Sequence, residues 1–166
     1  MGPCTSNRPL AICTAPCNGG GNGGAGFTDY AYIYNLGEQE VEKGTDVKFS
    51  NNEILSGGIT HTPGEEEIAL AKAGVYYIEY YAYAQTPTQF GLYLDGNLIS
   101  VSTVYSQGNS AAPIMGMAIV RIANPGDLTL RLIDTAGMST TLMDDKPATS
   151  DIDSVTASIV IIRIAD

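Results

Sequence analysis

The sequence has no tryptophan, a single histidine and three cysteines, and all three cysteines lie within its first 17 residues. The rest of the chain must therefore hold its core together without a disulfide. Charged residues amount to only 16%, against the usual quarter in a soluble domain, while 44% of the residues are hydrophobic. Over 166 residues this balance predicts one globular domain with part of its surface covered by a partner.

Basic residues are also scarce, with 8 lysines and arginines against 18 aspartates and glutamates, a net charge of -10. The chain thus lacks the basic patch that nucleic-acid binding needs, and it would be repelled by an anionic membrane surface. No apolar run reaches the roughly 18 to 20 residues that span a bilayer. The first residues do not resemble a secretion signal either, so we expect no membrane partner and no signal peptide.

The cysteines, Cys4, Cys13 and Cys17, match no zinc or redox spacing. Their odd number leaves at least one thiol without a partner in its own chain. Two interpretations remain open at this point: reduced cysteines on a tail, or cross-links between chains.

The chain divides into two parts of different amino-acid composition. Residues 1–26 are rich in proline and glycine and are predicted to be a flexible tail, whereas residues 27–166 read as the folded domain. In the domain, short apolar segments alternate with Gly, Pro, Asn and Asp, and no segment has a convincing helical period. Strands are predicted near residues 29–35, 46–50, 67–71, 75–84, 89–94, 99–105, 113–123, 127–134 and 154–165. Many short antiparallel strands predict an all-β sandwich of two sheets.

Some of these strands are apolar on one face and others on both. Residues 46–50 and 127–134 alternate apolar and polar side chains, as half-buried strands do. Residues 75–84, 113–123 and 154–165 are apolar on both faces, and so is the tyrosine-rich segment 29–35. Two sheets share one core, so a second apolar face needs another cover, and a second copy of the chain is the simplest one. The side chains predicted to form that interface are Tyr30, Tyr32, Tyr77, Tyr81, Tyr83, Met115, Met117, Val160 and Ile162. The alternative is one thick core within a single chain.

Several segments, in the right order, resemble a known superfamily. They are Tyr34–Gly37, Val47–Phe49, Ala73–Ile78, Phe90–Gly96, Asn124–Leu130 and Thr156–Ile164. Together they are similar to the jelly-roll domains of the complement and tumour-necrosis-factor (TNF-like) superfamily. The segment Gly57–His61 resembles its bacterial branch, the C-terminal domain of collagen-like exosporium glycoproteins of Bacillus and Clostridium spores.

The resemblance implies a two-sheet antiparallel jelly-roll sandwich that forms a homotrimer. It also implies a structural role on the spore surface, in the exosporium or outer coat, after synthesis in the mother cell. The tail, with its cysteines, would connect the trimer to other spore-layer proteins. The collagen-like stretch of the family is absent here, which favours a compact surface component over a stalk. The alternative function is a trimeric binding head that recognises a host receptor or a carbohydrate.

Few residues suggest catalysis or metal binding, so neither an enzyme nor a cofactor is predicted. His61 beside a proline is expected to be a surface or hydrogen-bonded turn residue rather than part of a Ser-His-Asp relay. The run Glu65 to Glu67 holds neighbouring carboxylates, not a pair facing each other across a cleft. The hard oxygen ligands of one late loop make a candidate calcium site, consisting of Asp144, Asp145, Asp151 and Asp153.

Overall fold

The computed structural model describes residues 27–166, which fold into an all-β sandwich of two antiparallel sheets. The only helical turn in this part of the chain is a short 3-10 turn, η1 (Val101–Thr103). The tail, 1–26, and its three cysteines lie outside the described residues. The expected all-β, two-sheet architecture is therefore confirmed.

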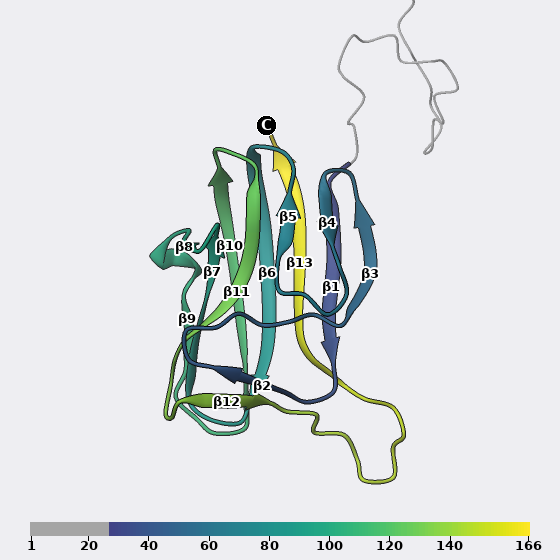
Figure 1. The fold of residues 1–166 in the computed structure, drawn as a ribbon, viewed down its shortest axis with the longest axis vertical. Helices are drawn as coiled ribbons and strands as arrows, with labels where there is room; N and C mark the ends of the chain where they lie inside the picture. Colours follow the sequence, from purple (N-terminus) through teal and green to yellow (C-terminus); the bar gives the residue numbers. More distant parts are fainter. Residues whose placement is uncertain (1–26) are drawn as a thin grey trace, which may run out of the picture.

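The first sheet is built from five long strands that run side by side along the molecule (Figure 1). Two short strands, β2 and β12, lie crosswise at one end, where β12 pairs with the last residue of β6. In spatial order the long strands are β3 (Asn51–Ser56), β1 (Tyr30–Leu36), β13 (Val155–Ala165), β6 (Gly74–Ala84) and β10 (Ala112–Ile122), and the short ones are β2 (Gln39–Glu42) and β12 (Ser139–Leu142).

The second sheet has six strands and covers one face of the first. From β5 onward, most of the connections between consecutive strands cross from one sheet to the other. Its main strand order is β4 (Ile59–His61), β5 (Ile68–Leu70), β11 (Gly126–Thr135), β7 (Thr88–Leu94) and β8 (Asn97–Leu98), and β9 (Tyr105–Gln107) pairs with β7. The turn between β7 and β8 has positive φ at both Asp95 and Gly96, as a tight hairpin turn requires.

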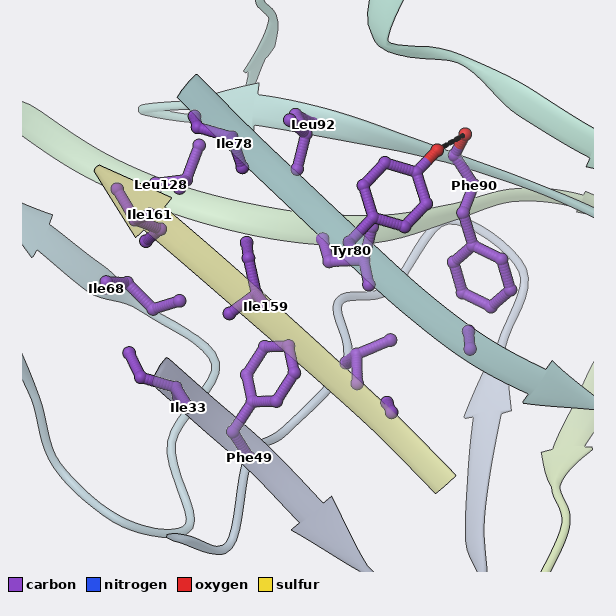
Figure 2. Packing of buried hydrophobic residues seen from close by; sticks show 14 of the residues in the cluster. Ile33, Phe49, Ile68, Ile78, Tyr80, Phe90, Leu92, Leu128, Ile159 and Ile161 are labelled. Atoms are coloured by element: carbon purple, nitrogen blue, oxygen red, sulfur yellow. Dashed lines mark hydrogen bonds between the residues drawn. The ribbon is translucent and has the colours of Figure 1, made fainter. Parts of the chain in front are cut away.

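The core lies between the sheets and consists mainly of Ile, Leu, Val and Phe side chains from alternate positions of the strands. Figure 2 shows Ile159 and Ile161 of β13 packed with Ile33 and with residues of the second sheet. Two tyrosines, Tyr76 and Tyr80, are the polar members of the core, and each is 1% exposed. The Tyr76 hydroxyl donates to the main-chain oxygen of Lys72 at 2.7 Å. The Tyr80 hydroxyl lies 3.1 Å from the main-chain oxygen of Phe90 and 3.0 Å from that of Thr103. A buried hydroxyl with two acceptors within reach costs little to desolvate.

Two predicted strands are wrong. Residues 46–50 alternate as a strand does, with Val47 and Phe49 fully buried, but they make only one isolated bridge, from Asp46 to Arg131. Scattered main-chain hydrogen bonds hold the segment instead of a continuous ladder: Val47 N–H donates to Leu130 O at 2.8 Å and Phe49 N–H to Glu65 O at 3.1 Å. The Arg131 guanidinium adds two 2.8 Å hydrogen bonds to the Asp46 carboxylate. Residues 99–105 contain η1 rather than a continuous strand. Sequence reasoning also missed the short strands β2, β3, β4, β8, β9 and β12.

The beginning and the end of the domain are joined at one end of the sandwich. The Asp29 carboxylate is 1% exposed and lies 2.7 Å from Lys72 Nζ and 3.5 Å from an Arg163 nitrogen, and it accepts the main-chain N–H of Gly58 at 2.6 Å. Position 57, just before Gly58, requires glycine. The φ angle of Gly57 is +68°, and a Cβ there would lie 2.0 Å from Asp29 Oδ1. Residues just after the tail and residues of the last strand are thus bound together.

Candidate assembly surface

The outward face of β3, β1, β13, β6 and β10 is apolar and has no cover among residues 27–166; we call it the assembly face. Strand register arranges its side chains in rows across the sheet. One row contains Ile119, Tyr77, Ile162, Tyr30 and Ser56, and the next contains Met117, Glu79, Val160, Tyr32 and Ile54. Both faces of the sheet are therefore apolar, as the sequence predicted, and only one of them meets the core.

Exposure of the large side chains rules out one thick core within a single chain. Met115, Met117 and Ile119 of β10 are 58%, 53% and 67% exposed, and Ile54 of β3 is 46% exposed. Apolar patches of this continuity are typical of interaction sites rather than of free surface. Methionine adapts its shape to a partner, which suits such a site.

Two tyrosine hydroxyls of the assembly face, those of Tyr77 and Tyr83, donate to carboxylates. Tyr77 donates to Glu79 Oε2 at 2.7 Å, and this bond together with the nearby carboxylate raises the pKa of Tyr77. Burial raises the pKa of Tyr81. Tyr32 and Tyr34 stack with ring centroids 5.6 Å apart. Because their pKa values are raised, Tyr77 and Tyr81 are uncharged at neutral pH. The Glu79 carboxylate already has a donor, which lowers the cost of covering it.

A shallow apolar hollow of about 320 Å³ opens on the assembly face at the β1 and β3 side. Its walls come from β1, β3 and β13 and from Phe27, which lies just before β1 in the chain. These walls expose almost no polar surface. The lining residues are Phe27, Tyr30, Ala31, Tyr32, Ile54, Val160 and Ile162.

All nine side chains predicted for an interface lie on the assembly face. Tyr83 lies toward its end and donates to Asp145 at 3.3 Å. Sequence reasoning missed Ile119, although its alternation with the buried positions of β10 was visible. It missed Ile54 because β3 was not predicted, and Phe27 because it was not assigned to any strand.

His61 lies in a structural environment. It is 8% exposed at the end of β4, so it is not a surface residue. Its Nδ1 is 2.6 Å from Asn52 Oδ1 and its Nε2 is 3.1 Å from the main-chain oxygen of Glu65. Within the described residues neither ring nitrogen contacts a serine hydroxyl or a carboxylate, so the geometry of a Ser-His-Asp relay is missing.

The acidic residues singled out from the sequence lie in two loops. Glu65, Glu66 and Glu67 are neighbours between β4 and β5, and Lys48 is 3.6 Å from Glu66. In the loop before β13, the Lys146 ammonium lies between Asp144 and Asp153, at 3.4 Å from the former and in hydrogen-bond contact with the latter.

Asp144 also accepts the main-chain N–H of Ser154 at 2.9 Å, and this bond, with the nearby lysine, lowers its pKa. Lys146 thus neutralises two of the four aspartates of the predicted calcium site, Asp144 and Asp153. The other two are Asp145 and Asp151. Calcium binding here stays a prediction.

Fold and uncovered sheet together define a class, the two-sheet jelly-roll domains of the TNF and complement type. The globular domain of zebrafish complement 1qA superimposes with a TM-score of 0.58 at 12% identity, covering 82% of this chain and 97% of that one. Eiger TNF from S. frugiperda superimposes with a TM-score of 0.57 at 12% identity, covering 84% of this chain and 94% of that one. The PRD1 vertex protein P5 has a TM-score of 0.51 at 14% identity, covering 84% of this chain and 99% of that one. At such identities the likeness shows the fold alone.

Residues 31–165 match the BclA C-terminal domain. The chain therefore belongs to the BclA C-terminal domain family, the C-terminal domain of collagen-like exosporium glycoproteins, and the resemblance drawn from its motifs is confirmed. The family and the structural neighbours are structural or binding domains rather than enzymes. No curated protein sequence matches significantly. In the described part of the chain, no helix is long and apolar enough to cross a membrane.

Proposed function

We propose that this chain is a structural, non-catalytic component of the bacterial spore surface that assembles as a homotrimer through the assembly face. Membership of an exosporium family supports the location. The uncovered apolar face is the observation that carries the assembly, because a sheet with a core on one side and exposed Met117 and Ile119 on the other needs a partner. The likeness to TNF and complement 1q domains supports a trimer over other closed assemblies.

The positions of the chain ends suit a surface role. Asp29 and Arg163 bind each other at one end of the sandwich, so the described domain begins and ends there. A trimer would then send three tails from one end and leave the opposite end, with β2 and β12, free. Cys4, Cys13 and Cys17 on those tails would form cross-links to other spore-layer proteins or between trimers.

Light scattering after size exclusion, on the full chain in reductant, tests the assembly. We expect a mass of three times 17.4 kDa. A monomer at micromolar concentration would contradict the proposal. Without reductant, higher multimers should appear and should be lost when the three cysteines are replaced by serine.

The location needs a separate test. Antibody against the domain should label the surface of intact spores, and extraction of the outer layer should remove the label. Label confined to the interior of broken spores would contradict a surface role, whatever the oligomeric state.

A further inference from the structure

The outer face of the second sheet, on the far side of the core from the assembly face, carries a polar pocket. Thr129 of β11 alternates with Leu128 and Leu130, which are fully buried in the core, so its side chain leaves the sheet on the outer side. We call this pocket, of about 280 Å³, the acidic pocket; its walls include Asp46, Glu67, Asp95, Asp127, Thr129 and Arg131. Assembly through the opposite face leaves it open, so a site here goes beyond the proposed function.

Strand pairing brings the walls of the acidic pocket together from three parts of the chain. The register between β11 and β5, continued by one residue beyond the start of β5, sets Glu67 beside Thr129. On the other side, Asp95 of the turn between β7 and β8 is joined to Asp127. The Asp95 carboxylate accepts the main-chain N–H of Asp127 at 2.8 Å, and the Asp95 N–H donates to the main-chain oxygen of Asp127 at 2.9 Å.

The one positive charge in the acidic pocket is already paired. Arg131 makes two 2.8 Å hydrogen bonds to Asp46, and its guanidinium carbon lies 4.4 Å from the centroid of the Tyr93 ring. None of the other three carboxylates of the pocket takes part in an ion pair within residues 27–166. The pocket therefore has an excess of three negative charges, which attracts a cation.

The Thr129 hydroxyl independently indicates a ligand. Thr129 is only 6% exposed, and its Oγ1 has no hydrogen-bond partner in the part of the chain that the structure describes. Leaving a buried hydroxyl without a partner is unfavourable, and few such groups occur in native structures. Because this side chain points outward into the acidic pocket, a donor bound there would satisfy it.

We propose that the acidic pocket binds a primary ammonium group, presented by a lysine side chain of a partner protein. An ammonium group has three N–H donors on a compact charge, which suits a hydroxyl acceptor and carboxylates that come from different segments. The volume of about 280 Å³ corresponds to about nine water molecules, enough for the ammonium and part of its alkyl stem.

A bare metal ion fits the acidic pocket less well. Within residues 27–166, Glu65, Glu66 and Glu67 are the only trio of such ligands whose oxygens lie within 4.8 Å of one another. The carboxylates of the acidic pocket are thus too far apart to share one calcium ion, which needs its oxygens at about 2.3–2.6 Å.

The test is a titration of the isotope-labelled full chain, in reductant, with N-acetyl-lysine methylamide. We expect saturable shifts of the amide NMR signals of Gly96, Asp127 and Thr129, and weaker binding as the salt concentration rises. The norleucine analogue, which keeps the alkyl stem but lacks the ammonium, should shift none of these signals. Equal shifts with both compounds, or no saturation with the lysine compound, would overturn the proposal.

Two variants each remove one feature of the acidic pocket. Thr129→Val should weaken binding of the lysine compound by roughly tenfold, and Asp127→Asn by about two- to fivefold. The controls are Thr88→Val, which removes another buried hydroxyl without a partner among the described residues, and Glu38→Gln, which removes an exposed carboxylate elsewhere. Both controls should bind normally. Equal losses in all four variants would show attraction by net charge alone.

Thr129→Val also tests whether the hydroxyl is without a partner in the chain. The midpoint of urea unfolding should stay the same or rise, since valine buries no polar group. A lower midpoint would show that the hydroxyl bonds within the chain, which contradicts its role as a ligand acceptor.

Two further probes separate the sources of the cation. Glucosamine presents an ammonium on a sugar ring, and calcium chloride supplies a bare ion. Tighter binding of either one in the acidic pocket than of the lysine compound would overturn a lysine partner. Light scattering on the same sample separates this inference from the proposed function. A trimer that binds no lysine compound overturns the inference alone, and a monomer that binds it overturns the trimer alone.

Discussion

Asp29 shows how one buried carboxylate can organise a chain end. Its oxygens contact Lys72, Arg163 and the N–H of Gly58, which lie in three different parts of the sequence. The hydrogen bond from Lys72 is the main reason that the pKa of Asp29 lies below its ordinary value of 3.8, and burial opposes it. The charge is thus retained although the side chain is almost fully buried, because its partners replace the lost water.

This shift makes a prediction about acid stability. Since the pKa is lower in the folded state, ionised Asp29 contributes stability above about pH 4, and this contribution is lost as the pH falls through the folded-state pKa. Asp29→Asn should lower the free energy of unfolding at pH 7 by about 1–3 kcal/mol and make the difference from the unmodified chain shrink in acid. Urea titrations at fixed protein concentration, from pH 7 to pH 3, measure it.

Asp134→Asn is the control. The pKa of Asp134 is also lowered, mainly by Lys43, but its side chain is 60% exposed, so solvent screens the pair. Asp134→Asn should therefore lower the free energy of unfolding at pH 7 much less than Asp29→Asn does. Equal losses for the two variants would contradict the role assigned to Asp29.

At the scale of elements, β10 lies against β6 with no room between Gly116 and Tyr80. The two residues are register partners, and a Cβ on Gly116 would lie 2.3 Å from the Tyr80 ring. The ring cannot turn away freely, because its hydroxyl is bound to two main-chain oxygens. Glycine at this position lets a large polar side chain fill the core without a bulge in the sheet.

Gly116→Ala should therefore destabilise the domain by about 1–3 kcal/mol through overpacking. Gly108→Ala is the matched control. Neither glycine has a positive φ, and a Cβ on Gly108 meets no atom within 4 Å. The midpoints of urea unfolding of the two variants, compared at one protein concentration, test this predicted loss of stability. Equal midpoints for the two variants would show that Tyr80 gives way without cost.

At the scale of the whole molecule, the uncovered sheet couples folding to assembly. If three chains bury the assembly face together, unfolding releases three chains at once. Mass action then makes the melting temperature rise with protein concentration. Differential scanning calorimetry of the full chain in reductant, over a hundredfold concentration range, should show this rise. It should be absent in Ile119→Glu at concentrations where light scattering finds that variant monomeric.

Much of the architecture could be predicted from local patterns. Alternating apolar residues and turn signals located the long strands β1, β6, β7, β10, β11 and β13 to within a few residues. They also showed that four of these strands are apolar on both faces. Short strands such as β2 and β4, and the segment that contains Phe49, were harder. Three to five residues carry too little periodicity to separate a paired strand from an extended segment without a continuous ladder.

Strand periodicity and composition are local properties, so the amino-acid order alone identifies an all-β domain with more apolar surface than one core can bury. The fold, in contrast, sets which apolar positions face outward together. It joined Ile54 on β3 to Met117 on β10 in a single row, although they are far apart in the chain, because strand order and register are set by long-range hydrogen bonding. It also decided that His61 is a buried hydrogen-bonded residue, since its partners Asn52 and Glu65 meet it only in the folded chain.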